Sequence, residues 1–202
     1  MLSDAELIQR WRDGDGNAGS KLVGRHFRAV FRFFRSKVGA EADELTQKTF
    51  LGCVESRDRF RDDLPFRAYL FGIARKQLLR HFEGRGKGFP ADAFSRMSVA
   101  DLAPSPSRLA AGREEVERLM VAMQRLPVDS QIAIELVHWE GLKLAAVAEV
   151  LGVSVGSIKG RMHRAREQLK RELDAATPGS SASFERDAEL LGKALDDSSP
   201  EH

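Results

Sequence analysis

Apolar residues recur at helical spacing along most of the chain, and stretches rich in glycine, proline and serine separate them. The clearest stripe predicts a long amphipathic helix that begins near Ser20 or Lys21. Its members are Val23, Phe27, Val30, Phe31, Phe34 and Val38. A shorter helix precedes it, opened by a capping box at Ser3–Glu6 and ended by the three glycines between positions 14 and 19. A third helix is predicted from Glu41 to Ser56.

The stretch from Phe60 to Phe82 predicts a turn followed by a helix. Asp62 and Asp63 favour the turn, and Pro65 suits the first position of a helix. One face of this helix is mostly apolar, and the other carries Arg67, Arg75, Lys76 and Arg80. By composition alone, this is an ordinary amphipathic helix with a basic face in solvent.

Residues 84–112 are rich in glycine, proline and serine and have weak periodicity, which predicts a linker. The glycines near its start lack the spacing of a phosphate-binding loop, and no strand precedes them, so we exclude such a loop. Beyond the linker we expect two helices and then a helix-turn-helix. Its first helix runs from Leu142 to Leu151, and its second from Val155 to about Leu173, with Ser154 as the N-cap. The pattern predicts an all-α protein of two small helical domains joined by a flexible linker.

Charge is unevenly distributed along the 202 residues, although the formal net charge is only +2. Residues 57–87 hold nine lysines and arginines against four acids, and residues 159–171 hold six against one. Residues 174–202 hold two against seven. Two basic segments and an acidic tail suit a protein that binds nucleic acid.

Several classes of site are not expected. The single cysteine, Cys53, allows neither an intramolecular disulfide nor a cysteine zinc site, and its apolar neighbours predict a buried thiol. The five histidines show no metal-ligand spacing, and no catalytic set is evident, so we expect no metal, cofactor, small-molecule substrate or enzymatic activity. Without a signal sequence or a membrane-spanning stretch, we expect a cytoplasmic protein that does not insert into the membrane.

Two motifs, in order, resemble segments of the extracytoplasmic-function (ECF) sigma factors, the small two-domain members of the sigma-70 family. Phe60-Arg61, Phe66-Arg67-Ala68-Tyr69-Leu70 and Ile73-Ala74-Arg75 are similar to the segment that melts the promoter. Glu140-Gly141-Leu142, the run from Val147 to Arg161, and His163-Arg164-Ala165-Arg166 are similar to the reader of the minus-thirty-five element. The resemblance covers about residues 3–175.

The resemblance implies two partners, the RNA polymerase core and promoter DNA, and possibly an anti-sigma factor. Residues 1–83 would bind the core and the minus-ten element, residues 113–175 would bind the minus-thirty-five element, and residues 176–202 form an acidic tail. Core binding would involve Asp43, Glu44, Gln47 and Lys48 on the third helix, with Leu45, Thr49 and Val54 facing inward. Minus-ten DNA would be held by Arg61, Arg67, Arg75, Lys76 and Arg80. Minus-thirty-five DNA would be bound by Ser154, Ser157, Lys159, Arg161, His163 and Arg164.

Several positions depart from the family pattern, among them Gly19-Ser20, where family members often carry a larger apolar residue. Lys48 stands where glutamate is usual and Lys76 where asparagine is usual, while Lys143 replaces a serine or threonine helix cap. In the tail, Phe184, Ala188, Leu191 and Leu195 mark a short amphipathic helix. Two readings stay open for it, a frayed terminus or a helix that docks on a basic DNA-binding face. The alternative function is a stand-alone helix-turn-helix regulator, which would leave the motifs before residue 83 unexplained. An enzyme such as a nuclease is a third class.

Overall fold

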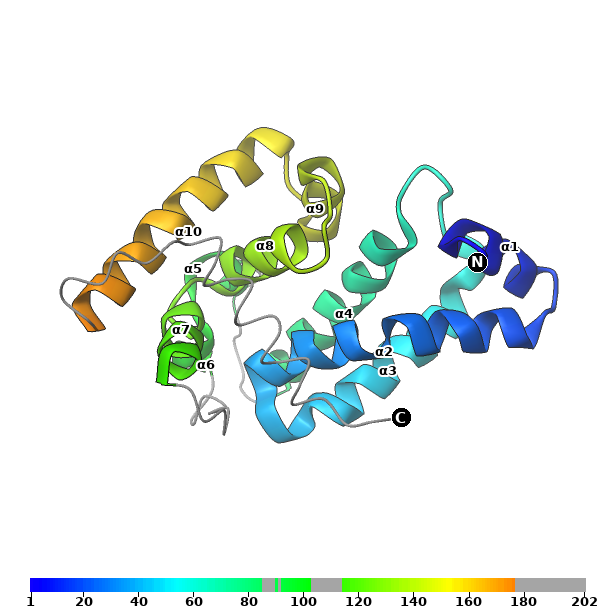
Figure 1. The fold of residues 1–202 in the computed structure, drawn as a ribbon, viewed down its shortest axis with the longest axis horizontal. Coiled ribbons are helices and arrows are strands. Elements are labelled where there is room, and N and C mark those ends of the chain that lie inside the picture. The colour runs from blue at the N-terminus through cyan, green and yellow to red at the C-terminus, as the bar shows by residue number, and fades with distance from the viewer. Residues whose placement is uncertain (85–89, 91, 103–113, 177–202) are drawn as a thin grey trace.

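The computed structural model of the protein describes residues 1–84, 90, 92–102 and 114–176 (Figure 1). Within these residues the chain forms helices and no strand, which confirms the all-α prediction. The helices are α1 (Asp4–Arg12), α2 (Gly16–Val38), α3 (Ala42–Ser56), α4 (Phe66–Glu83), α5 (Ala93–Arg96), α6 (Val99–Leu102), α7 (Glu114–Gln124), α8 (Val128–His138), α9 (Leu144–Leu151) and α10 (Val155–Ala176). The tail helix expected around Phe184–Leu195 lies outside the described residues.

The first helix begins as predicted, but the second begins earlier than expected. At α1, the Ser3 hydroxyl accepts from the Glu6 amide while the Glu6 carboxylate accepts from the Ser3 amide, which confirms the capping box. Helix α2 begins at Gly16 because the Asp15 carboxylate accepts from the amides of Asn17 and Ala18. This cap stabilises the first turn, so Gly16 and Gly19 lie inside the helix instead of ending it.

Gly19 allows α1 and α2 to approach closely. A Cβ atom at this position would lie 2.5 Å from Nε1 of Trp11, a distance that side chains do not tolerate. The buried Gly19 is therefore a packing requirement of the α1–α2 contact. A Cβ atom at Gly24, one and a half turns further along α2, would meet no atom within 4 Å.

Part of the predicted linker is ordered as two one-turn helices, α5 and α6. Phe94 and Val99 are buried, and the Phe94 ring packs edge-on against Phe82 at the end of α4. The amide of Val128 donates to the carbonyl of Met97 at 2.9 Å, which joins this segment to the start of α8. The segment thus bridges the helices that precede and follow it.

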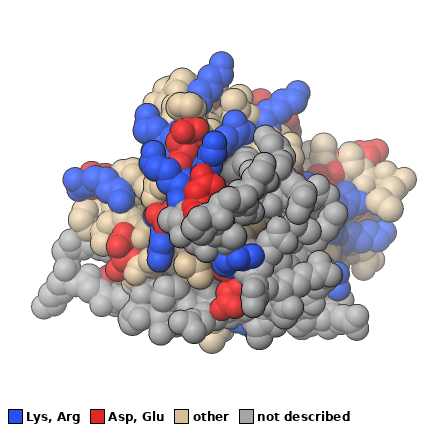
Figure 2. Space-filling view, turned by 60° about the vertical axis from the view of Figure 1, so that its left-hand side comes forward, with Lys and Arg blue, Asp and Glu red and all other residues tan. Residues whose placement is uncertain are grey.

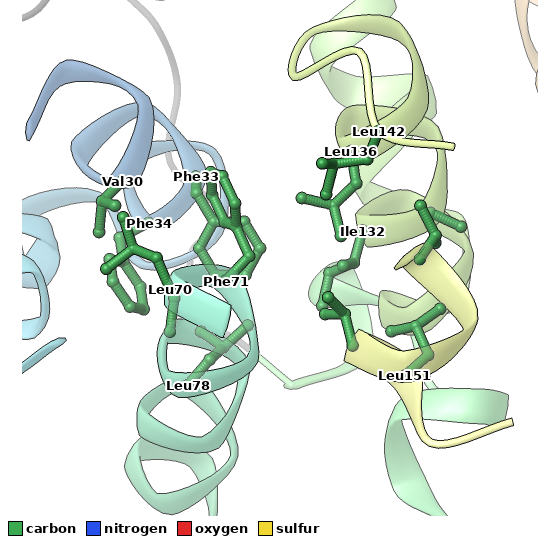
Figure 3. Packing of buried hydrophobic residues seen from close by; sticks show 14 of the residues in the cluster. Val30, Phe33, Phe34, Leu70, Phe71, Leu78, Ile132, Leu136, Leu142 and Leu151 are labelled. Carbon is green, nitrogen blue, oxygen red and sulfur yellow. The ribbon is translucent and has the colours of Figure 1, made fainter. Parts of the chain in front are cut away.

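Helices α1–α4 and α7–α10 form two groups that pack against one another. Figure 3 shows the apolar side chains of α2 and α4, such as Phe33 and Phe71, beside those of α8 and α9, such as Ile132 and Leu151. The contact covers the C-terminal part of the basic side of α2, where Arg32 is 7% exposed and Lys37 is fully buried, while Arg25 and Arg28 nearer its start are exposed. An amphipathic pattern predicts that this side of the helix faces solvent, but here the second group of helices covers it.

Lys37 is held by a buried polar cluster at this contact. Its ammonium group donates to Glu135 of α8 at 2.5 Å, to the Ser36 hydroxyl at 3.0 Å and to the Phe33 carbonyl at 2.9 Å. Gln131 donates to the other Glu135 oxygen at 2.9 Å. Burial lowers the pKa of Lys37, although the Glu135 carboxylate opposes that shift.

Cys53 is buried in α3, as the sequence predicts, and its burial raises the pKa of the thiol to about 12. The thiol is therefore protonated and unreactive near neutral pH. Over the residues that the structure describes, no helix is both long and apolar enough to cross a membrane.

The two glycines of α2 should respond to alanine in opposite directions. Gly24→Ala should raise the free energy of unfolding by about 0.5–1 kcal/mol, because alanine favours a helix interior and the site is open. Gly19→Ala should lower it by about 1–3 kcal/mol, because the new methyl group displaces the Trp11 ring. Urea unfolding followed by circular dichroism measures both. Equal effects at the two positions would contradict the close α1–α2 contact.

Stability should fall in mild acid because of His26. Burial lowers the pKa of His26 despite its 2.8 Å contact with the Asp4 carboxylate, so the unfolded chain takes up the proton first. The contribution of neutral His26 is complete above pH about 6.5 and is lost as the pH falls through the lowered pKa. Unfolding free energies measured between pH 8 and pH 5 should decline more for the native protein than for His26→Gln, which keeps a donor toward Asp4 but does not titrate.

Candidate nucleic-acid and polymerase interfaces

The loop between α3 and α4 is held in place by aromatic packing and by Arg12 of α1. Phe60 is buried and packs edge-on against Phe66 and Tyr69 of α4. The Arg12 guanidinium donates to the carbonyls of Arg57 and Phe60 and lies over the Phe60 ring. The sequence analysis gave Arg12 no role, since a single arginine near a helix end carries no distinguishing pattern.

The loop and α4 form one wall of a cleft of about 370 Å³. Arg59, Arg61, Tyr69 and Lys76 are among the residues that line it. The Tyr69 hydroxyl donates to the Ser56 carbonyl at 2.7 Å, which ties the ring to the end of α3. The cleft combines cationic side chains with partly exposed aromatic surface, a combination suited to an unpaired nucleic-acid strand.

The five basic residues predicted to contact minus-ten DNA are not equally available. Arg61 is exposed and forms an ion pair with Asp63 at 2.5 Å, which raises the pKa of the guanidinium. Arg67 donates to the Glu140 carbonyl at 2.9 Å, and Arg75 lies 2.9 Å from the Asp129 carboxylate. Lys76 and Arg80, like Arg61, have exposed side chains. The fold therefore brings all five to the loop and to α4, but two of them face the second group of helices.

The helix-turn-helix consists of α9 and α10 and forms as predicted. Gly152 ends α9 in the left-handed conformation at φ +67°, and the Ser154 hydroxyl accepts from the Ser157 amide at 3.2 Å to cap α10. At the other end of α9, Lys143 occupies the N-cap position and makes no side-chain capping bond.

The residues predicted to read minus-thirty-five DNA lie in the first turns of α10. Ser154, Ser157, Lys159, His163 and Arg164 are exposed. Arg161 is the exception, since only 16% of its side chain is exposed and its Nη1 lies 3.5 Å from the Asp129 carboxylate. Figure 2, which brings the α10 side of the molecule forward, shows lysine and arginine side chains crowded there, with carboxylates among them.

Four polar side chains share the outer face of α3, as the sequence analysis expected of a polymerase-binding surface. Asp43, Glu44, Gln47 and Lys48 are all exposed. Lys48 donates to Glu44 at 2.5 Å, and this contact lowers the pKa of the Glu44 carboxyl group.

The inner side of α3 differs from the prediction at one position. Leu45 and Thr49 are buried as expected, but Val54 is 40% exposed, so its predicted inward position is wrong. Val54 lies beside Leu51, which is 57% exposed, and the two extend the outer surface of α3 with apolar area.

The sequence analysis missed the acidic residues that face these cations. Asp129, Glu135 and Glu140 are each at most 6% exposed, and Glu149 lines the cleft beside α4. In sequence they look ordinary, since Asp129 lies in the first turn of α8, Glu140 follows its end, and Glu135 and Glu149 lie inside helices where charged residues are common. Across the described ranges, no three histidine, cysteine, aspartate or glutamate side chains are grouped so that they could hold a metal ion.

Comparison with known proteins assigns each of the two groups of helices to a protein family. The sigma-70 region 2 family matches residues 22–88, and the sigma-70 region 4 family matches residues 116–169. The sigma factor CnrH of Cupriavidus metallidurans is 32% identical over 182 residues, covering 86% of this chain and 95% of CnrH. The ECF sigma factor SigM of Mycobacterium tuberculosis is 31% identical over 182 residues, covering 88% of both chains.

This chain belongs to the ECF sigma factors. It is a transcription initiation factor that binds the RNA polymerase core and directs it to specific promoters. These matches favour a sigma factor over a stand-alone helix-turn-helix regulator, because they include the first group of helices as well as the second.

Solved structures of sigma factors share this fold. CnrH, in complex with the cytosolic domain of CnrY, superimposes with a TM-score of 0.62 at 28% identity and covers 86% of this chain and 99% of CnrH. RpoE of Bartonella quintana, in complex with the anti-sigma factor NepR, also gives 0.62, at 23% identity over 77% of this chain and 96% of RpoE. The fold is therefore two helical domains, the second a helix-turn-helix.

The N-terminal caps of the two helices of the helix-turn-helix should respond differently to substitution. Lys143→Ser should stabilise the protein by about 1 kcal/mol, because a hydroxyl can accept from the first-turn amides of α9. Ser154→Ala should destabilise it by about 1 kcal/mol, since it removes the acceptor for the Ser157 amide. Thermal unfolding measures both changes. A stabilising effect of Ser154→Ala would contradict the cap assigned here.

Proposed function

We propose that the two helical groups of this sigma factor bind separate parts of the promoter. Residues 1–83 form the domain for the polymerase core and the minus-ten element, and residues 113–175 form the domain for the minus-thirty-five element. Residues 84–112 connect them, and residues 176–202 are an acidic tail. The observation that carries this proposal is the cleft beside α4, where basic side chains from the loop and the helix surround partly exposed aromatic surface.

In this proposal the minus-ten strand lies along α4. Arg61, Arg67, Arg75, Lys76 and Arg80 contact its phosphates, and an unstacked base enters the cleft by the Phe60–Tyr69 aromatic cluster. Lys76 carries only hydrogen-bond donors, so it favours phosphate or base acceptors. The protein supplies no catalytic group, and the transcription chemistry belongs to the polymerase.

Upstream duplex DNA is bound by the start of α10. Ser154 and Ser157 lie in its first turn, where recognition helices meet base edges, and Lys159, Arg161, His163 and Arg164 follow at positions that reach bases or phosphates. The Ser154 hydroxyl caps the Ser157 amide, and the helix axis points the remaining first-turn amides of α10 toward DNA bound at this end.

The polymerase core binds the outer face of α3 through Asp43, Glu44, Gln47 and Lys48. Exposed Leu51 and Val54 supply apolar area beside these polar groups. The protein works in the cytoplasm with the polymerase, and an anti-sigma factor is a further partner, since homologous CnrH is structurally known with the cytosolic domain of CnrY.

Asp43→Lys should weaken binding to the polymerase core by at least tenfold, because it reverses a charge at the centre of the proposed contact. The assay is co-elution of the labelled chain with sigma-free core, followed by transcription from a promoter library. The native protein should co-elute one-to-one and select a defined set of promoters.

Glu83→Lys is the matched control, since it makes the same charge change at an exposed position at the end of α4. It should co-elute like the native protein. If the native chain bound duplex DNA tightly alone and did not co-elute with core, the proposed division of labour would be wrong.

A further inference from the structure

Arg12, the last residue of α1, binds the loop that connects α3 to α4 through its whole guanidinium group. Its Nε donates to the Arg57 carbonyl at 3.1 Å, and its Nη2 donates to the Phe60 carbonyl. Its Nη1 donates to the Asp62 carboxylate at 3.4 Å, and the group lies 5.4 Å from the centre of the Phe60 ring. A planar guanidinium presents its donors in a fixed fork that suits these acceptors, whereas a lysine ammonium is a single point charge.

These bonds fix the loop backbone where it forms a wall of the cleft. A single 3₁₀ turn runs from Arg57 to Arg59, and the Phe60 amide closes it by donating to the Arg57 carbonyl at 3.2 Å. The two carbonyls that Arg12 holds lie on either side of Arg59 and directly before Arg61. Both Arg59 and Arg61 are exposed and line the cleft. Arg12 therefore sets the directions in which these two side chains leave the backbone.

The end of α1 is itself held between α2 and the loop. Trp11 packs on the buried Gly19 of α2, where a Cβ atom would overlap the indole ring. On the loop side, the Arg57 guanidinium lies 6.0 Å from the centre of the Trp11 ring. The match to the sigma-70 region 2 family begins at residue 22, so it does not include α1.

Arg12 does not itself face the cleft. Its side chain is 17% exposed, and each of its three guanidinium nitrogens donates to a protein oxygen. It is not among the residues that line the cleft. An effect of Arg12 on DNA must therefore act through the loop that it holds.

We propose that Arg12 is a positioning residue for minus-ten recognition, which keeps the α3–α4 loop in its strand-binding shape before DNA arrives. The inference rests on the proposed function for the role of the cleft. A loop that is already ordered loses less conformational entropy when a strand binds. It also presents Arg59 and Arg61 in one arrangement, so a base that does not fit cannot be accommodated by movement of the loop. Helix α1 thus contributes to promoter selectivity without contacting DNA.

Arg12→Lys should reduce selectivity at the minus-ten element, because it keeps the charge and loses the fork. The assay is transcription by polymerase core loaded with the full chain, from a duplex library randomised at both promoter elements. Selectivity at an element is the ratio of transcript yields for the most and the least favoured base at its most selective position. We expect this ratio to fall at least about fivefold at the minus-ten element and to stay unchanged at the minus-thirty-five element.

Arg10→Lys is the matched control. It makes the same substitution two residues earlier in α1, at a side chain that is 56% exposed and pairs with Asp15 at 2.8 Å. It should keep the native ratio at both elements. The minus-thirty-five ratio separates positioning from a loss of folded protein, because a smaller folded fraction lowers all yields alike.

Hydrogen exchange of the free native protein tests the order of the loop without a variant. The amides of Phe60 and Leu64 donate within the loop, to the carbonyls of Arg57 and Arg61, both at 3.2 Å. They should exchange at least about tenfold more slowly than in an unstructured chain. Arg12→Lys should remove this protection, and Arg10→Lys should retain it.

Two results would overturn the inference. In one, Arg12→Lys keeps the native ratio at the minus-ten element, so the fork does not set selectivity. In the other, the loop amides of the native protein exchange as fast as in an unstructured chain, so Arg12 holds no ordered loop. A native protein without any preference at the minus-ten element would instead count against the proposed function, because the exchange measurement contains neither polymerase nor DNA.

Discussion

A lysine without access to water needs protein groups around its charge, and Lys37 finds the necessary carboxylate only in the other half of the chain. Glu135 of α8 supplies it, with Ser36 and the Phe33 carbonyl as the other acceptors. The observed position of the second domain meets this requirement, because it places the Glu135 carboxylate 2.5 Å from the Lys37 ammonium where water is excluded. Arg32 and Glu140 repeat the arrangement five residues earlier along α2.

The contact between the domains is more polar than the packing inside each domain. Each domain has its own apolar packing, with Phe34 and Leu70 in the first and Ile132 and Leu136 in the second (Figure 3). Between the domains, the apolar contact is accompanied by buried ion pairs, which bind partners selectively and add little net stability.

The ion pairs between the domains involve some of the side chains that are proposed to contact DNA. On α4, Lys76 and Arg80 point to solvent while Arg67 and Arg75 face carboxylates of the second domain. On α10, Arg161 alone among the proposed DNA contacts turns toward Asp129. The α3 surface proposed for polymerase lies apart from these ion pairs, so its exposed residues are available in the same arrangement.

The sequence by itself determined the longer helices and the family, but not α5 and α6 within the predicted linker. Stripes at helical spacing and local caps such as Ser3 and Ser154 depend on neighbours within one or two turns, so they can be recognised without a structure. Only the tertiary structure decided that α2 begins at Gly16 after the Asp15 cap, so that Gly16 and Gly19 lie inside the helix. It likewise decided that Val54 faces outward. It also decided that Lys37 is buried and that Asp129 joins two arginines. Pairing across the domains links residues between 54 and 108 positions apart, and no local pattern records which charge will meet which.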